Sequence, residues 1–96
     1  MNIKFHSEAK IEFIEASEYY EDQVVGLGDV FIEEVENVLH VIKHHPFSGA
    51  KITVSTRRFL VPRFPYGIIY SVKDDLITIF AVMNLRRKPG YWKLRT

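Results

Sequence analysis

Cysteine is absent from this sequence of 96 residues, and long apolar runs are absent as well. Without cysteine there is no disulfide framework, no thiol nucleophile and no thiolate-based zinc or iron–sulfur site. The apolar runs are only a few residues long, too short to span a bilayer. Charged side chains occur throughout the first fifteen residues, which therefore lack the apolar core of a signal peptide. We expect a cytoplasmic protein that has no membrane partner.

The composition is that of a folded chain. Hydrophobic residues make up 47% of it and aromatic residues 14%, enough for one modest core at this length. There is no internal repeat, linker or low-complexity tract. We therefore expect a single domain over residues 1–96.

The net charge of +1 conceals a strong asymmetry between the two halves of the chain. Residues 1–48 carry ten acidic and three basic side chains, whereas residues 49–96 carry two acidic and ten basic ones. One interpretation is that the basic half binds an acidic or polyanionic partner. The other is that the two halves attract each other inside the fold.

Apolar residues in the first half recur at spacings of three and four, which is typical of amphipathic helices. They predict helices over Ser7–Asp22 and Leu27–His44, with Ser7 as the N-cap of the first and Pro46 ending the second. The short alternating segment Asn2–Phe5 before them predicts a strand. Because the link between the helices is short, we expect an antiparallel hairpin.

The second half is rich in β-branched and aromatic residues, which favour strands. Turn residues divide it into four segments of this composition: Ile52–Val54, Arg57–Phe64, Tyr66–Val72 and Leu76–Met83. We therefore predict an α+β fold of order β-α-α-β-β-β, in which the helical hairpin packs on one face of a small antiparallel sheet.

Most patterns of catalytic or metal-binding residues are missing or weak. Glu36, His40 and His44 share a helix face, but no further ligand lies nearby in the sequence, and a solvated helix end whose cations suit the helix dipole explains them better. The helix carboxylates have the spacing of a solvent-facing surface. No glycine-rich phosphate loop and no Gly-x-Ser-x-Gly motif occurs. We expect neither a metal nor a cofactor.

Basic residues interleaved with aromatic ones are the remaining candidates for function. Guanidinium groups can bind phosphates or carboxylates, and aromatic faces can stack on bases. Ordinary packing of a C-terminal tail onto the sheet is the alternative. The candidate binding set is Arg57, Arg58, Arg63, Arg86, Arg87, Trp92 and Arg95.

Two stretches carry a family resemblance. Phe64–Tyr70 reads FPYGIIY, and Ala81–Arg95 combines an apolar strand ending in Ala-Val with arginines and Pro-Gly-Tyr-Trp. These stretches resemble the C-terminal signature of the RelE/ParE superfamily of toxins from type II toxin–antitoxin, or plasmid stabilisation, modules. The paired Tyr19-Tyr20 and the segment Gly26–Gly28 fit the upstream pattern, so the resemblance covers nearly the whole chain.

The resemblance implies a growth-inhibiting toxin and a cognate antitoxin that folds over the basic groove as it binds. It also implies one of two targets. ParE-like members inhibit DNA gyrase and are not known as nucleases, whereas RelE-like members are ribosome-dependent endonucleases that cut mRNA. The chain is an enzyme only in the second case, and Arg58, Arg87 and Tyr91 would then be the catalytic candidates. A third possibility is a degenerate member that only binds its antitoxin.

Two departures from the RelE-like pattern favour the gyrase hypothesis. Asn84 replaces the usual histidine of the last motif, and an amide cannot carry a proton near neutral pH. Gly67 follows Tyr66 at a position where the RelE-like pattern has a basic residue. Tyr91 could transfer a proton only if neighbouring cations lowered the pKa of its phenol from about 10.

Overall fold

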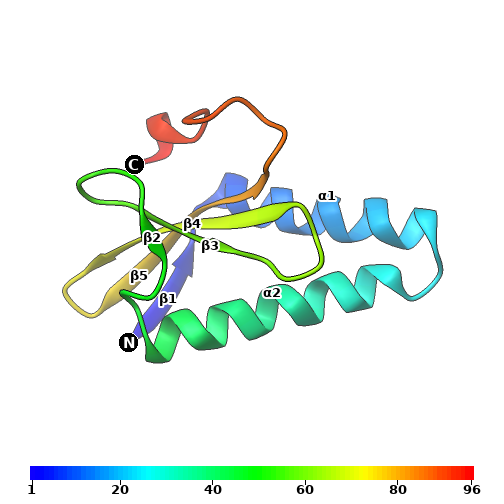
Figure 1. Ribbon diagram of the computed structural model, residues 1–96, viewed down its shortest axis with the longest axis horizontal. Helices are drawn as coiled ribbons and strands as arrows, with labels where there is room; N and C mark the ends of the chain where they lie inside the picture. Colours follow the sequence, from blue (N-terminus) through cyan, green and yellow to red (C-terminus); the bar gives the residue numbers. More distant parts are fainter.

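The computed structural model describes residues 1–96 and shows a helical hairpin lying against one face of a five-stranded sheet (Figure 1). The strand order in the sheet is β1-β5-β4-β3-β2. The elements are β1 (Asn2–Phe5), α1 (Ser7–Gln23), α2 (Leu27–His44), β2 (Ala50–Lys51), β3 (Arg57–Leu60), β4 (Tyr66–Lys73), β5 (Leu76–Asn84) and the 3-10 helix η1 (Lys93–Arg95). The predicted α+β fold with its helical hairpin is confirmed.

The sheet is mixed rather than purely antiparallel. β3, β4 and β5 form an antiparallel meander, but β1 pairs in parallel with β5 from Asn2↔Leu76 to Phe5↔Ile79. The helical hairpin carries the chain from the β1 edge across one face of the sheet, and this long connection is what a parallel partner requires. The local sequence pattern predicts where strands lie but not which strands pair, so the sequence did not predict this parallel pairing.

The segment Ile52–Val54, although rich in β-branched residues, forms no strand, because Thr53 bends the chain there. Its hydroxyl accepts hydrogen bonds from the backbone N–H groups of Ser55 and Thr56, and the paired residues are instead Ala50 and Lys51. Such side-chain bonds to nearby backbone compete with strand pairing.

The predicted end of β3 and the predicted N-cap of α1 also differ from the structure. β3 ends at Leu60 instead of Phe64; Pro62 cannot donate to a ladder, and Arg63 adopts a left-handed φ of 68°. The N-cap of α1 is His6 rather than Ser7, because the His6 Nδ1 atom accepts a hydrogen bond from the Glu8 N–H.

The main core lies between the helices and one face of the sheet. α2 contributes the buried residues Phe31, Val35 and Ile42, in the spacing predicted from the sequence. They meet alternate residues of β4 and β5, including the fully buried Tyr70, whose hydroxyl donates to the Pro46 carbonyl oxygen at 2.8 Å. Neither helix has the length and apolar character that crossing a bilayer requires.

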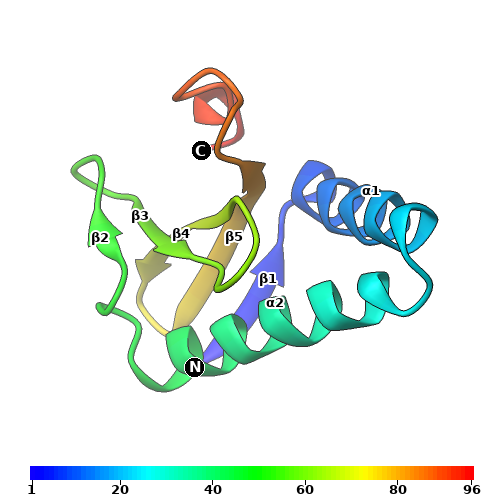
Figure 2. The ribbon, with the colours of Figure 1, turned by 45° about the vertical axis from the view of Figure 1, so that its right-hand side comes forward.

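A second, smaller cluster lies on the opposite face of the sheet. An irregularity in the β4–β5 pairing at Ile69/Tyr70 brings Ala81 and Met83 to this face beside Ile69. Trp92 packs on them and is only 4% exposed. The C-terminal segment therefore covers the face that the helices leave open, as Figure 2 shows.

Candidate functional site

The carboxylate of Glu12 in α1 holds three side chains of the C-terminal segment together. Its Oε2 atom accepts hydrogen bonds from the Tyr91 hydroxyl at 2.7 Å and from Arg87 at 3.1 Å. Arg95 donates to both Glu12 oxygens, at 2.9 and 3.1 Å, and also to the Phe80 carbonyl oxygen at 2.9 Å. We call Glu12, Arg87, Tyr91 and Arg95 the Glu12 clamp.

The position of Glu12 follows from the packing of α1. It lies three residues after Ala9 and four before Ala16, two buried alanines beside which a longer side chain has room. Its Oε1 atom also accepts a bond from the Val82 N–H at 3.1 Å, and its side chain is only 13% exposed. Sequence analysis placed the helix carboxylates on the solvent face and so missed Glu12. The signal that could have revealed it is its position between two small core residues.

The clamp keeps the Tyr91 phenol protonated. Burial raises the pKa of Tyr91 above its ordinary value of about 10, and the hydrogen bond to Glu12 and the charge of Glu12 raise it further. The charges of Arg87 and Arg95 act in the opposite direction but do not prevail. The lowering of the phenol pKa that proton transfer by Tyr91 requires is therefore not found.

Both arginines of the clamp pair with the same carboxylate, whose single negative charge offsets only one of their two positive charges. Burial alone lowers the pKa of Arg95, but its hydrogen bond to Glu12 and the charge of Glu12 outweigh this effect and raise it. The Arg87 guanidinium lies over the Tyr91 ring, 3.6 Å from its centroid. The side chain of Arg87 is 52% exposed, whereas that of Arg95 is 15% exposed. Only Arg87 can therefore still meet a partner from solvent.

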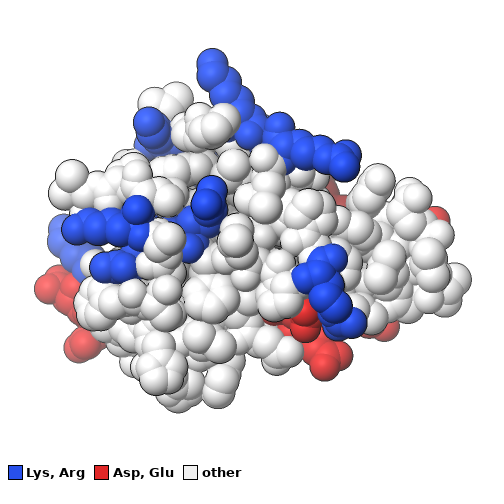
Figure 3. All heavy atoms as spheres, in the orientation of Figure 1, with Lys and Arg blue, Asp and Glu red and all other residues white.

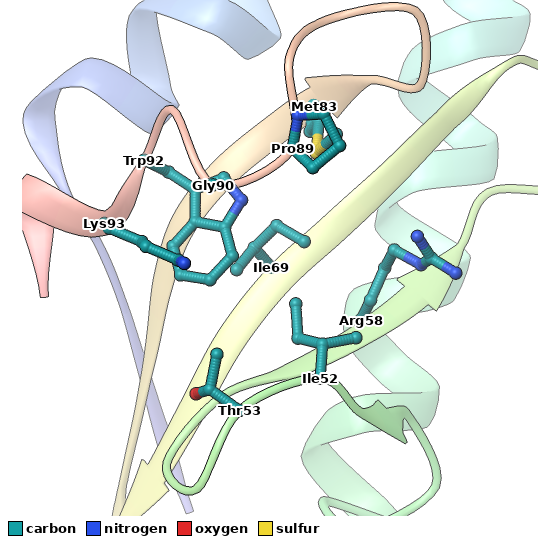
Figure 4. A pocket seen from close by; sticks show the side chains of 9 residues that line it. All are labelled: Ile52, Thr53, Arg58, Ile69, Met83, Pro89, Gly90, Trp92 and Lys93. Carbon is teal, nitrogen blue, oxygen red and sulfur yellow. The ribbon is translucent and has the colours of Figure 1, made fainter.

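Arg58 belongs to a different place, a pocket of about 240 Å³ on the sheet face that the C-terminal segment covers. Its floor is apolar, and Arg58 and Lys93 approach it from opposite sides (Figure 4). We call this the tail pocket. Trp92 is part of its buried lining and offers no free ring face to a ligand.

The glycine that departs from the RelE-like pattern makes room for Arg58. A Cβ atom at Gly67 would lie 3.1 Å from the Arg58 Cγ and 3.2 Å from its Cδ, so the stem of Arg58 crosses β4 there. The Arg58 Nε atom is buried and has no hydrogen-bond partner.

Arg57 and Arg63 lie apart from both places. Arg57 donates to the carbonyl oxygens of Phe47 and Gly49 in the segment that joins α2 to β2. Arg63, in the turn before β4, pairs with Glu34 of α2 at 3.3 Å. The arginines predicted as one set are thus divided among several places on the surface.

Asn84 shapes the turn that follows β5. Its side-chain oxygen accepts a hydrogen bond from the Arg86 N–H at 2.9 Å, and its carbonyl oxygen accepts one from the Arg87 N–H at 3.0 Å. The turn leaves Arg86 and Lys88 exposed, and neither has a salt bridge. Figure 3 shows that Lys and Arg atoms gather over the strands and the C-terminal segment, so a cationic surface remains although the clamp is closed.

The arrangement suits binding better than proton-transfer chemistry. The nuclease candidates are divided between two pockets, with Arg58 in the tail pocket and Arg87 in a cleft that Glu12, Tyr66 and Asn84 also line. Burial raises the pKa of Tyr66 as well. No imidazole lies in either pocket, and neither phenol is poised to act as a base near neutral pH.

Comparisons with known proteins identify the fold and the family signature. The family described as ParE toxin of type II toxin–antitoxin system, parDE, matches residues 3–89. Among solved structures, a chain of the chromosomal ParDE TA system from P. aeruginosa is similar, with a TM-score of 0.64 and 17% sequence identity. The match covers 88% of this chain and 95% of that one. A search of curated proteins finds no match.

Proposed function

Because this chain belongs to the ParE toxin family of type II toxin–antitoxin systems, we propose that it arrests growth by binding and inhibiting DNA gyrase once it is free of its antitoxin. A toxin of such a system has an antitoxin as its partner. The gyrase target is what the family resemblance implies. Because gyrase acts on DNA inside the cell, the proposed action of the toxin is in the cytoplasm.

The observation that carries this proposal is the closed Glu12 clamp. Cleavage of RNA needs a base for the 2′-hydroxyl, free cations for the phosphorane and an acid for the leaving oxygen. Here one carboxylate already pairs with both Arg87 and Arg95 and accepts a hydrogen bond from the Tyr91 hydroxyl. These contacts support inhibition through binding over the alternative of mRNA cleavage.

Arg86 is the residue that we propose for the contact with gyrase, together with the exposed part of Arg87. Arg86 is exposed on the turn after β5 and makes no side-chain ion pair. Charges at the rim of an interface steer association without supporting the fold. A charge reversal there is therefore expected to weaken inhibition and leave folding unchanged.

A supercoiling assay with purified toxin and gyrase tests the proposal. We expect inhibition at micromolar toxin, and Arg86→Glu should raise the concentration for half-inhibition about tenfold. Lys73→Glu, at the exposed far end of β4, is the matched control and should match the wild type.

Unchanged supercoiling at micromolar wild-type toxin would overturn the gyrase assignment. Cleaved mRNA in a ribosome-containing extract would establish the nuclease alternative instead. Continued growth after induction of the toxin without antitoxin would indicate a degenerate member that only binds its antitoxin.

A further inference from the structure

A groove of about 320 Å³ lies between the turn end of the helical hairpin and the turn that joins β3 to β4. Its lining is Tyr20, Leu27, Val30, Arg63, Phe64 and Pro65. We call it the hairpin groove. The rings of Tyr20 and Phe64 pack edge to face with their centroids 4.8 Å apart, a favourable arrangement that holds both rings in place. The groove therefore has a largely apolar floor that exists before any ligand arrives.

The surroundings of the hairpin groove are acidic. Residues 11–42 contain nine acidic residues and no lysine or arginine. Glu33 and Glu34 follow Val30 by three and four positions, so they are its neighbours on the surface of α2. Glu34 pairs with Arg63, the one cation of the lining, whereas Glu33 is exposed and has no salt bridge. A ligand that matches the groove carries an apolar group for the floor and a cation for the rim.

The chain itself presents such a segment near its C-terminus. Leu94 is a large apolar side chain, yet it is 100% exposed. It lies in η1 directly after Lys93, which is exposed and has no salt bridge. A single exposed leucine is common on protein surfaces. This one adjoins a cation, and the same chain has an apolar groove with an acidic rim, so the two surfaces are complementary.

The hairpin groove and η1 of the same copy lie too far apart to meet. Figures 1 and 2 both show η1 above the sheet and the turn of the hairpin at the far end of the two helices. Leu94 can therefore reach a hairpin groove only in a second copy. Two copies related by a two-fold axis can make this contact twice, because each then offers its groove to the other, and the pair is closed.

We propose that two copies of the protein form such a reciprocal pair, in which Leu94 of each copy enters the hairpin groove of the other and Lys93 pairs with Glu33. The charge asymmetry along the chain favours this arrangement, since it brings the acidic half of one copy to the basic half of the other. Few side chains take part in each contact, so the pair is weak. The proposal goes beyond the proposed function, because neither gyrase nor an antitoxin takes part.

Sedimentation equilibrium of the full-length protein tests the proposal. The apparent mass should rise from 11.3 kDa, the mass of one chain, toward that of two as the concentration rises from about 10 µM to about 1 mM. Leu94→Asp brings a carboxylate to an acidic groove, and we expect it to raise the dissociation constant about tenfold. Lys93→Glu should act in the same direction. The thermal midpoint of each variant controls for folding.

Lys73→Glu is the matched control for Lys93→Glu. It makes the same change of charge at the exposed far end of β4, away from both the hairpin groove and η1. Its dissociation constant should stay within about twofold of the wild type.

A mixture of two variants tests which surfaces meet. Glu33→Lys leaves η1 intact but makes the rim of the groove cationic, so this variant alone should pair as poorly as Leu94→Asp alone. In the mixture, η1 of the Glu33→Lys copy can enter the unchanged groove of the Leu94→Asp copy, which restores one of the two contacts. The mixture should therefore contain more pairs than either variant at the same total concentration.

Four outcomes would overturn the proposal. The first is an apparent mass that stays at 11.3 kDa up to about 1 mM, and the second is wild-type association of Leu94→Asp. The third is a mixture that pairs no better than its components, which would mean that the copies meet through like surfaces. The fourth is growth beyond two chains, which would show an open series in place of a closed pair. Because gyrase takes no part in these measurements, the gyrase proposal stands or fails separately.

Discussion

Glu12 is the residue on which the C-terminal segment depends. One carboxylate, mostly shielded from water, accepts bonds from two guanidinium groups, one phenol and one backbone N–H. Removing one partner of a shielded charge group leaves the others unpaired, which costs more than the pair itself contributes. The clamp is therefore a sensitive point of the structure although it lies outside the main core.

Replacing Glu12 should detach the C-terminal segment from the sheet. We expect Glu12→Ala to lower the free energy of unfolding by about 3 kcal/mol, because it leaves Arg95 and the Tyr91 hydroxyl without their acceptor. Urea titration monitored by fluorescence of Trp92, the only tryptophan, measures both the loss and the exposure of the indole. Glu15→Ala, exposed on the same helix, should stay within about 0.5 kcal/mol of the wild type. Equal losses in the two variants would contradict this role of the clamp.

The helical hairpin is the element in which sequence and structure agree best. α2 covers the predicted range Leu27–His44, and α1 is only one residue longer than predicted, because helical periodicity is a local property. The closing contact of the hairpin was not predicted. Both oxygens of Glu21 accept backbone N–H groups at the start of α2, from Gly26 at 2.8 Å and from Gly28 at 3.0 Å.

Gly28 is expected to be irreplaceable because the two helices touch there. A Cβ atom at this position would lie 2.6 Å from the Ser17 carbonyl oxygen and 2.9 Å from the Glu21 Cβ. Alanine favours helix formation by about 1 kcal/mol over glycine, yet we expect Gly28→Ala to destabilise the protein by roughly 1–3 kcal/mol through this clash. Thermal unfolding measures the effect, with Val25→Ala in the exposed interhelical turn as the control. A higher melting temperature for Gly28→Ala would show that the helices can separate at no cost.

At the scale of the whole molecule, the acidic and basic halves do meet, but only at a few points. Glu12 binds Arg87 and Arg95, and Glu34 binds Arg63, while other cations remain exposed. The attraction between the two halves is therefore confirmed at these points, and a partner for the cations that remain exposed stays a prediction. The Glu12–Arg95 contact joins residues 83 positions apart, and the parallel β1–β5 pairing joins the two ends of the fold. Such contacts depend on how the elements are arranged in space, which periodicity and turn residues do not determine.

Alkaline pH should lower the stability of the whole protein, because phenols with a raised pKa lie at several places in the fold. Tyr20 lies between the helices and the sheet, Tyr66 on β4 and Tyr91 in the clamp, and burial is the main cause that raises the pKa of each phenol. A phenol with a raised pKa in the folded state stays protonated there, while the unfolded chain ionises near pH 10. Its contribution to stability is thus complete below pH 10 and is lost as the pH rises toward the folded-state pKa.

The free energy of unfolding should therefore fall steadily above about pH 10, and part of that fall should come from the clamp. Urea titrations at a series of pH values from neutral to strongly alkaline measure the slope. Tyr91→Phe removes one titrating phenol and should make the slope shallower, even though the loss of its bond to Glu12 lowers stability at neutral pH. A slope for Tyr91→Phe as steep as that of the wild type would mean that this phenol ionises as freely in the folded protein as in the unfolded chain. The clamp would then not hold its proton.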